Sequence, residues 1–181
     1  GMVFQKYTLY PWMSVQRNVE FGLKLQGVAR KVRRERASYY LDVVGLANFA
    51  NSLPKELSGG MKQRVAIARA LACHPKILLM DDPFGALDVQ TKEAMQLFLL
   101  DLWKRTRCTI LMITHDVEEA VFLSQRIYVM TARPGTIQQE IIVDLPEERT
   151  YALKRDPQFQ SYKHEITDLL RGKQDLGLVT V

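Results

Sequence analysis

The sequence contains no apolar run that approaches the roughly 20 residues needed to cross a bilayer. Its N-terminus shows no signal-peptide pattern, so we expect no membrane-spanning segment. Cysteine is scarce: the two residues present, Cys73 and Cys108, lie inside apolar helix or strand patterns and not at metal-ligand spacing. We therefore expect buried, reduced thiols, and neither a disulfide nor a cysteine metal site. With 181 residues, 47% of them hydrophobic, the chain suits one globular domain with room for a subdomain.

One short segment carries most of the net charge of +5. Five of the seven residues 30–36 are Lys or Arg, and one is Glu. A run of this kind could contact nucleic acid or anionic lipid. The apolar residues that follow at helical spacing, Ala37, Tyr40, Leu41 and Val44, instead favour the solvated face of an amphipathic helix.

Two glycines stand directly before a predicted helix over residues 61–72, in the stretch Leu57-Ser58-Gly59-Gly60-Met61-Lys62-Gln63-Arg64. Without a Cβ, Gly59 and Gly60 leave backbone N–H groups accessible at the positive end of the helix dipole. Ser58 adds a hydroxyl donor, so the stretch predicts a cradle for an anion, most naturally a phosphate. The alternative is that Ser58 is an ordinary N-cap and the glycines an ordinary loop.

A continuous apolar run, residues 77–80, ends in two carboxylates, Asp81 and Asp82. Such a run predicts a central parallel strand buried on both faces, and open α/β sheets place their ligands at the carboxyl ends of such strands. A second run, residues 110–113, leads through Thr114 to His115 at the same edge. Both strands need neighbours, so we also expect exposed apolar surface around them and a tendency to self-associate.

The order of these motifs resembles that of the ATP-binding subunit of ATP-binding-cassette (ABC) transporters. LSGGMKQR at 57–64 resembles the signature motif, ILLMD at 77–81 the Walker B strand, GALD at 85–88 the D-loop, and THD at 114–116 the switch histidine. All four stand in the family's order and spacing. The resemblance implies an α/β fold: a partial P-loop NTPase (RecA-like) core of ABC type with an inserted all-helical subdomain.

The resemblance implies ATP and Mg²⁺ as cofactors, and it implies catalytic roles residue by residue. Asp81 would be the magnesium ligand, and Gln5, in the Q-loop position, would reach the magnesium and the attacking water. Asp82 would polarise that water, and His115 would hold it together with the γ-phosphate. Without these motifs, Gln5 and His115 would be read as polar residues at strand ends.

The resemblance also implies roles at a contact between two subunits. Ser58, Gly59 and Gly60 would bind the nucleotide held by a second ATPase subunit. Asp88, in the D-loop, would lie at the dimer interface.

Two features depart from the family pattern. Asp82 stands where the family places a glutamate, and a displacement of about 1 Å at a reacting centre costs on the order of a hundredfold in rate. The phosphate-binding loop G-x-x-x-x-G-K-[ST] does not occur; the one Gly-Lys pair, Gly172-Lys173, is followed by Gln174. In the family this loop precedes the Q-loop, so we expect the chain to cover the later part of the domain and to be inactive alone.

We expect three parts: the Q-loop and helical subdomain at 1–58, the core with the four motifs at 59–145, and a C-terminal helical extension at 146–181. The predicted helices cover residues 15–25, 30–44, 47–51, 61–72, 89–105, 117–123 and 158–170. The predicted strands after the switch histidine cover residues 126–131 and 136–143. Ser14, Asp88 and Asp116 are the predicted N-caps.

The family's helical subdomain contacts a transmembrane permease subunit, which implies a peripheral position on the cytoplasmic face of the cell membrane. Tyr10, Trp12 and Met13 are large apolar residues before a predicted cap and form a candidate contact surface. The segments YPWMSV at 10–15 and ARPGTI at 132–137 resemble the nitrate, sulfonate and taurine branch of importers.

Two other functions are compatible with parts of the sequence. A non-catalytic interaction module could dock on a permease or a full-length ATPase subunit without hydrolysing ATP. A DNA-repair member of the superfamily would need long coiled-coil arms, and the 51 residues between Gln5 and Leu57 leave no room for them. We therefore expect no nucleic-acid partner.

Overall fold

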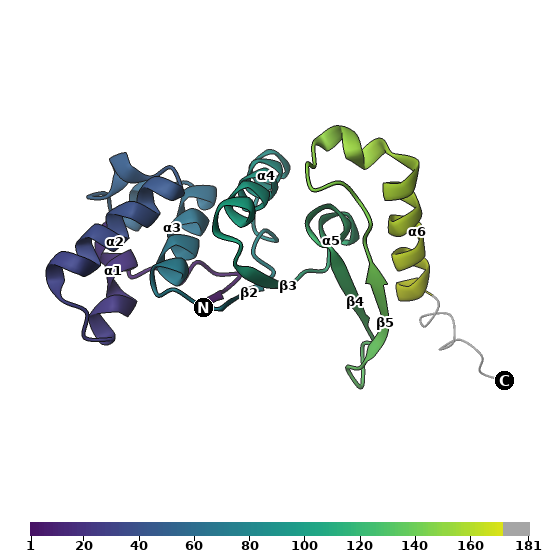
Figure 1. Cartoon of the computed structure of the whole chain (residues 1–181), viewed down its shortest axis with the longest axis horizontal. Coiled ribbons are helices and arrows are strands. Elements are labelled where there is room, and N and C mark those ends of the chain that lie inside the picture. The colour runs from purple at the N-terminus through teal and green to yellow at the C-terminus, as the bar shows by residue number, and fades with distance from the viewer. Residues whose placement is uncertain (172–181) are drawn as a thin grey trace. The chain divides into compact units, whose positions relative to one another are not determined.

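The computed structural model describes residues 1–171, and the chain forms two compact units that divide between Ile113 and Thr114 (Figure 1). Within the described residues, no helix has both the length and the apolar character needed to cross a membrane. The predicted division into three parts stays a prediction, and its last ten residues lie outside the described part of the chain.

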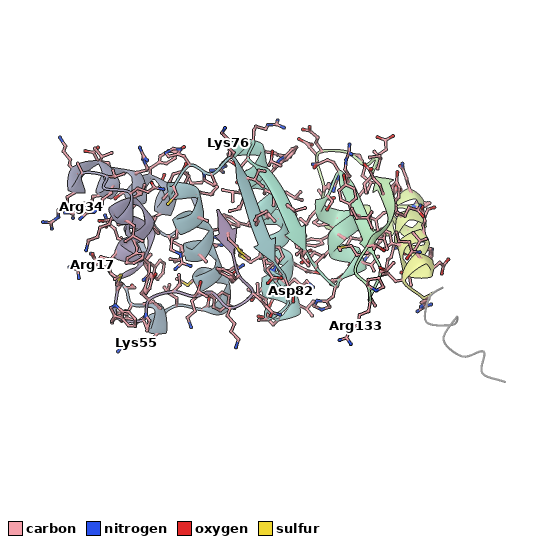
Figure 2. All side chains as sticks on the ribbon, turned by 90° about the horizontal axis from the view of Figure 1, so that it is seen from below. Arg17, Arg34, Lys55, Lys76, Asp82 and Arg133 are labelled. Atoms are coloured by element: carbon pink, nitrogen blue, oxygen red, sulfur yellow. The ribbon has the colours of Figure 1, made fainter. Side chains whose placement is uncertain are left out.

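The first unit contains a parallel sheet of three strands in the order β1 (Met2–Val3), β2 (Ile77–Asp81) and β3 (Thr109–Ile113). Val3 pairs with Met80, and Asp81 pairs with Ile113. Because the strands are parallel, the carboxyl ends of β2 and β3 meet at one edge, where Asp82 lies (Figure 2).

The prediction that the second strand is buried on both faces is wrong. Burial alternates along β2: Leu78 and Met80 are buried, whereas Ile77 is 49% and Leu79 40% exposed. The exposed face, which we call the open face, continues over Met2, Leu111 and Ile113. An apolar run is buried on both sides only when both sides are covered, and in this unit one face is covered. The expected exposed apolar surface is thereby confirmed, while self-association stays a prediction.

Three helices, α1 (Val15–Leu25), α2 (Arg30–Val43) and α3 (Gly59–Ala72), pack against one another in the same unit. The predicted cap of α1 is present, with the Ser14 hydroxyl accepting a hydrogen bond from the N–H of Arg17 at 3.3 Å. Short 3₁₀ turns at Ala47–Phe49 and Pro54–Glu56 join α2 to α3. Helix α3 begins two residues earlier than predicted, because Ser58 is its N-cap and both glycines lie in its first turn.

The basic run lies on α2, whose apolar side is buried through Ala37, Tyr40 and Leu41. Arg34, in the middle of the run, is exposed (Figure 2). This arrangement confirms the interpretation of the run as the solvated face of an amphipathic helix.

The fourth helix, α4 (Val89–Thr106), is capped by Asp88 as predicted, and its buried stripe contains Met95, Leu99 and Leu102. The two thiols are free, as predicted, but both are half-buried, so the prediction that they are buried is wrong.

The second unit contains α5 (Val117–Leu123), an antiparallel pair of strands, β4 (Arg126–Met130) and β5 (Ile137–Ile142), and α6 (Pro157–Arg171). Helix α6 packs on α5 and β4, and a 3₁₀ turn at Tyr151–Arg155 precedes it. Arg149 is buried, and its Nη1 atom donates to the carbonyl oxygens of Phe122 at 2.8 Å and Ser124 at 2.9 Å, at the end of α5. The orphan carbonyls of this short helix are thus capped by a side chain distant in sequence.

Candidate functional site

Two adjacent carboxylates mark the carboxyl edge of the three-stranded sheet. Asp81 is the last residue of β2 and is exposed, and the N–H of Asp82 donates to the carbonyl of Ile113 at 2.8 Å. Asp82 adopts a φ of +41°, a conformation uncommon for residues other than glycine. The chain then folds back, so that a Cβ on Gly85 would lie 2.3 Å from Oδ2 of Asp82. Position 85 therefore requires glycine while Asp82 keeps this rotamer.

The structure brings Gln5 to this edge. Its Nε2 atom donates to Oδ2 of Asp82 at 2.7 Å, although the two residues are 77 positions apart. Gln5 lies just beyond β1, which pairs with β2, and this pairing brings the glutamine to the end of the neighbouring strand. The sequence predicted this proximity through the Q-loop resemblance. The catalytic roles of Gln5 and Asp82 stay predictions.

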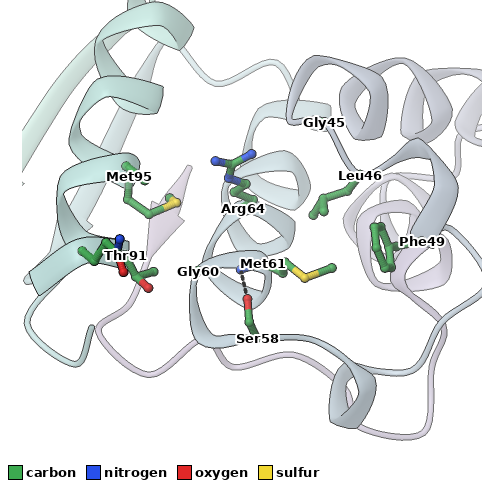
Figure 3. A pocket seen from close by; sticks show the side chains of 11 residues that line it. Gly45, Leu46, Phe49, Ser58, Gly60, Met61, Arg64, Thr91 and Met95 are labelled. Carbon is green, nitrogen blue, oxygen red and sulfur yellow. Dashed lines mark hydrogen bonds between the residues drawn. The ribbon is translucent and has the colours of Figure 1, made fainter. Parts of the chain in front are cut away.

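The predicted anion cradle lies at the start of α3 (Figure 3). The Ser58 hydroxyl accepts a hydrogen bond from the N–H of Met61 at 3.3 Å, so Ser58 is a true N-cap, and its own proton can still be donated. The N–H groups of Gly59 and Gly60 lie in the first turn, at the positive end of a helix of 14 residues. The N-cap alternative and the cradle are therefore compatible.

Packing restricts both glycines. A Cβ on Gly60 would lie 2.8 Å from Cγ2 of Thr91, and a Cβ on Gly59 would lie 3.0 Å from the Tyr7 hydroxyl oxygen. A cavity of about 480 Å³ adjoins the cradle, between the start of α3 and the start of α4, with Thr91 and Met95 on its α4 side (Figure 3). Ser58 is exposed and Gly59 is half-buried, but Gly60 is buried against α4, so the expectation that both glycines are accessible is wrong for Gly60.

Asp88 acts locally as the N-cap of α4. Its Oδ1 atom accepts a hydrogen bond from the N–H of Thr91 at 3.0 Å, and hydrogen bonding to Thr91 lowers the pKa of the Asp88 carboxyl below its usual range. The side chain is exposed. Its predicted place at a dimer interface stays a prediction.

His115 is exposed and lies two residues after β3, at the start of the second unit. The residues on either side are fixed: the Thr114 hydroxyl donates to the carboxylate of Glu119, and the N–H of Asp116 donates to Oγ1 of Thr114 at 3.1 Å. Oδ1 of Asp116 accepts from the N–H of Glu119 at 3.1 Å, which confirms the predicted cap. The place of His115 relative to Asp81 and Asp82 stays a prediction.

The oxygen atoms at the sheet edge fit the requirements of Mg²⁺. Within residues 1–171 no group of three or more His, Cys, Asp or Glu side chains could hold a metal ion. Magnesium keeps several of its waters and is usually bound through one or two carboxylates plus substrate phosphates. Asp81, the last residue of β2, supplies a carboxylate of this kind, and Asp82 follows it in the chain.

Sequence reasoning missed two residues that hold the loop after Gln5. Arg69 on α3 donates to the carbonyl oxygen of Thr8 at 2.8 Å, and buried Asn18 on α1 donates to the carbonyl oxygen of Met13 at 3.0 Å. Burial lowers the pKa of the Arg69 guanidinium. A signal was present for Arg69, which is the one charged residue between Val65 and Ala72 of an otherwise apolar stretch. A charge in such a setting indicates a specific partner.

Comparison with known proteins identifies relatives of this chain. The ABC transporter domain family matches residues 1–85. The nitrate import ATP-binding protein NrtD of Synechocystis is 65% identical over 180 residues, which cover 96% of this chain and 68% of that protein. The taurine import ATP-binding protein TauB of Rhizobium johnstonii is 48% identical over 183 residues, covering 97% of this chain and 69% of that protein.

A solved structure confirms the predicted fold class. The dimeric ATP-binding cassette MJ0796, in a post-hydrolysis state bound to ADP and Pi, matches with a TM-score of 0.64 and 37% identity. The match covers 79% of this chain and 62% of the cassette. The chain therefore spans about two thirds of the length of these relatives.

Proposed function

The chain belongs to the ABC transporter ATP-binding family, and we propose that it is the part of an importer's ATPase subunit that carries the hydrolytic residues and the signature motif. The single observation that carries this proposal is the hydrogen bond between Gln5 and Asp82 in a chain 65% identical to a nitrate import ATP-binding protein. Nitrate, sulfonate or taurine is the proposed class of solute, as in NrtD and TauB.

In this proposal ATP and Mg²⁺ bind at the carboxyl edge of the sheet. The ion, when bound, neutralises phosphate charge, and Asp81 is its protein ligand. Asp82 orients the attacking water, and the amide of Gln5 fixes the carboxylate through its 2.7 Å hydrogen bond. His115 donates a hydrogen bond where negative charge grows in the transition state.

The cradle works on a different nucleotide. Two ATPase subunits pair head to tail, and Ser58, Gly59 and Gly60 face the phosphates held by the phosphate-binding loop of the partner, near Asp88. The support for this step is the N-terminus of a 14-residue helix, with exposed Ser58 as its N-cap and Gly59 as its first residue. The pair docks on a transmembrane permease at the cytoplasmic face of the membrane, through Tyr10, Trp12 and Met13. Trp12 is 72% exposed, which suits a contact residue.

The 181 residues contain no phosphate-binding loop, so we propose that the chain alone does not turn over ATP. The same observation favours a second candidate function, a non-catalytic module that docks on a permease or on a full-length subunit. The two functions differ in whether the cradle can complete a site in a partner.

Measurement of phosphate release in the presence of Mg²⁺ and ATP distinguishes these two functions. The partner is the full-length Synechocystis relative with the serine of its own signature motif replaced, so that its homodimer is inactive. We expect no turnover by the chain alone and restored turnover in the mixture, because the partner supplies the phosphate-binding loop and the chain supplies the cradle. Failure of a mixed assembly to hydrolyse ATP would favour the docking module. Steady turnover by the chain alone, lost in His115→Ala, would show that the proposal of inactivity is wrong.

A further inference from the structure

The loop that joins Gln5 to α1 is held at two points. The first is Arg69, whose Nη1 atom donates to the carbonyl oxygen of Thr8 at 2.8 Å, while Nη2 donates to the Thr8 hydroxyl at 2.9 Å and to the carbonyl of Tyr7 at 3.4 Å. The second is Asn18, which exchanges hydrogen bonds with the backbone of Tyr10 and also donates to the carbonyl of Met13. Asn18 is fully buried. The loop is thus tied to two helices, α3 through Arg69 and α1 through Asn18.

The backbone of this loop needs the first of these anchors. Thr8 adopts a φ of +46°, in the left-handed region that a β-branched residue rarely occupies. Such a conformation persists only where the surroundings enforce it. The planar guanidinium of Arg69 contacts the carbonyl and the hydroxyl of this one residue, a two-point grip that a single ammonium group reproduces poorly.

The same loop reaches both candidate sites. Gln5, three residues before Thr8, donates to Asp82 at the carboxyl edge of the sheet. Tyr7 lies against the cradle, where a Cβ on Gly59 would come within 3.0 Å of its hydroxyl oxygen. On the N-terminal side Gln5 is anchored by the pairing of Val3 with Met80, and on the C-terminal side by Arg69.

We propose that Arg69 is a positioning residue that fixes the loop 6–9 and thereby holds the Gln5 amide on Asp82 and the Tyr7 ring against Gly59. The inference rests on the proposed function in so far as Gln5, Asp82 and the cradle act on nucleotide. The contact itself is a property of the chain without ligand. Loss of the guanidinium frees the loop between its remaining anchors, and the Gln5 amide leaves the carboxylate.

The test uses the isotope-labelled 181-residue chain without nucleotide and follows the Gln5 side-chain amide resonance and the backbone order parameters of residues 6–9. In Arg69→Met we expect these order parameters to fall from about 0.85 to below about 0.6, and the Gln5 amide signal to move to the position of a solvated amide. Arg69→Lys should behave in the same way, because the charge is kept and the fork is lost. Arg64→Met is the matched control: Arg64 is on the same helix, its pKa is also lowered by burial, and it contacts Val44 and Phe98. The control should leave both signals unchanged.

An unchanged Gln5 signal and rigid residues 6–9 in folded Arg69→Met would overturn the proposal, as would an equal change in Arg64→Met. If Arg69→Met does not fold, Thr8→Ala removes one acceptor of Arg69 while keeping the helix intact, and it should lower the same order parameters. The readout contains no nucleotide, so its outcome is separate from that of the phosphate-release assay. If Gln5 becomes mobile in Arg69→Met while the mixture with the unmodified chain fails to hydrolyse ATP, the proposed function alone is refuted.

Discussion

Replacement of Ser58 by aspartate separates the two functions of that residue. As an N-cap, Ser58 accepts the hydrogen bond from the N–H of Met61, and aspartate performs this as well as serine does. We therefore expect the free energy of unfolding to stay within about 0.5 kcal/mol of the wild type. Ser58→Ala, which removes the acceptor, should cost about 1 kcal/mol.

In contrast to its small effect on stability, Ser58→Asp should lower the affinity of the cradle for an anion. A carboxylate about 4 Å from one phosphate charge repels it by about 1 kcal/mol at the dielectric constant of bulk water and by about 4 kcal/mol near a protein surface. These energies correspond to an affinity lowered by about fivefold to about a thousandfold. Turnover in the mixed assembly should fall accordingly in Ser58→Asp, and less in Ser58→Ala, where the backbone N–H groups remain.

The assays are urea unfolding of each variant and phosphate release by the mixed assembly across a range of ATP concentrations. Ser14→Asp is the matched control, because Ser14 caps α1 with the same 3.3 Å geometry and lies outside the cradle. Full turnover in Ser58→Asp, with a stability equal to that of the wild type, would refute the assignment of the cradle to phosphate.

Three further predictions concern other parts of the chain. Trp12→Ala should change the free energy of unfolding by less than about 0.5 kcal/mol, because Trp12 is 72% exposed, yet weaken co-purification of the complete subunit with its permease; a large loss of stability would instead make Trp12 a core residue. Arg149→Met should destabilise the second unit by about 2–4 kcal/mol in urea unfolding, because buried carbonyls lose a charged donor, and an effect no larger than that of Arg126→Met, at an exposed ion pair, would contradict this. Hydrogen bonds from Lys163 and Lys154 lower the pKa of Glu118 below its ordinary value of 4.5, so its stabilising contribution is present above that value and is lost as the pH falls through the folded pKa. Glu118→Gln should flatten this acid limb in unfolding measured against pH, and an unchanged limb in this variant would refute the reasoning.

The sequence predicted best the features that a few neighbouring residues determine. Ser14, Asp88 and Asp116 all cap the helices they were expected to cap, because an N-cap needs one side chain and the N–H group three residues later. Ser58 also caps its helix, as the alternative interpretation of that stretch had it. The edge of the sheet was also predictable, since a strand that ends in a carboxylate places it there. The contact of Gln5 with Asp82 required the resemblance to a known family, because nothing local links residues 77 positions apart.

The wrong prediction concerned burial, which depends on whether other elements cover each face of the sheet. The run from Ile77 to Met80 has the composition of a strand buried on both faces, but composition does not say whether both covers are present. The structure covers one face and leaves Leu79 and Leu111 exposed. The clasp of Arg69 on Thr8 was missed for a related reason, because its acceptors are mostly backbone carbonyls, which every sequence has.

Gly60 is subject to a constraint that has nothing to do with nucleotide. A methyl group at this position would come within 2.8 Å of Thr91, so side-chain packing between α3 and α4 excludes larger residues. In a gene copy that had lost ATP hydrolysis, selection would still act against replacement of this glycine as long as the fold was needed. Retention of Gly60 in a descendant therefore reports on the survival of the fold, and the decay of an exposed residue such as His115 would be the earlier record of lost catalysis.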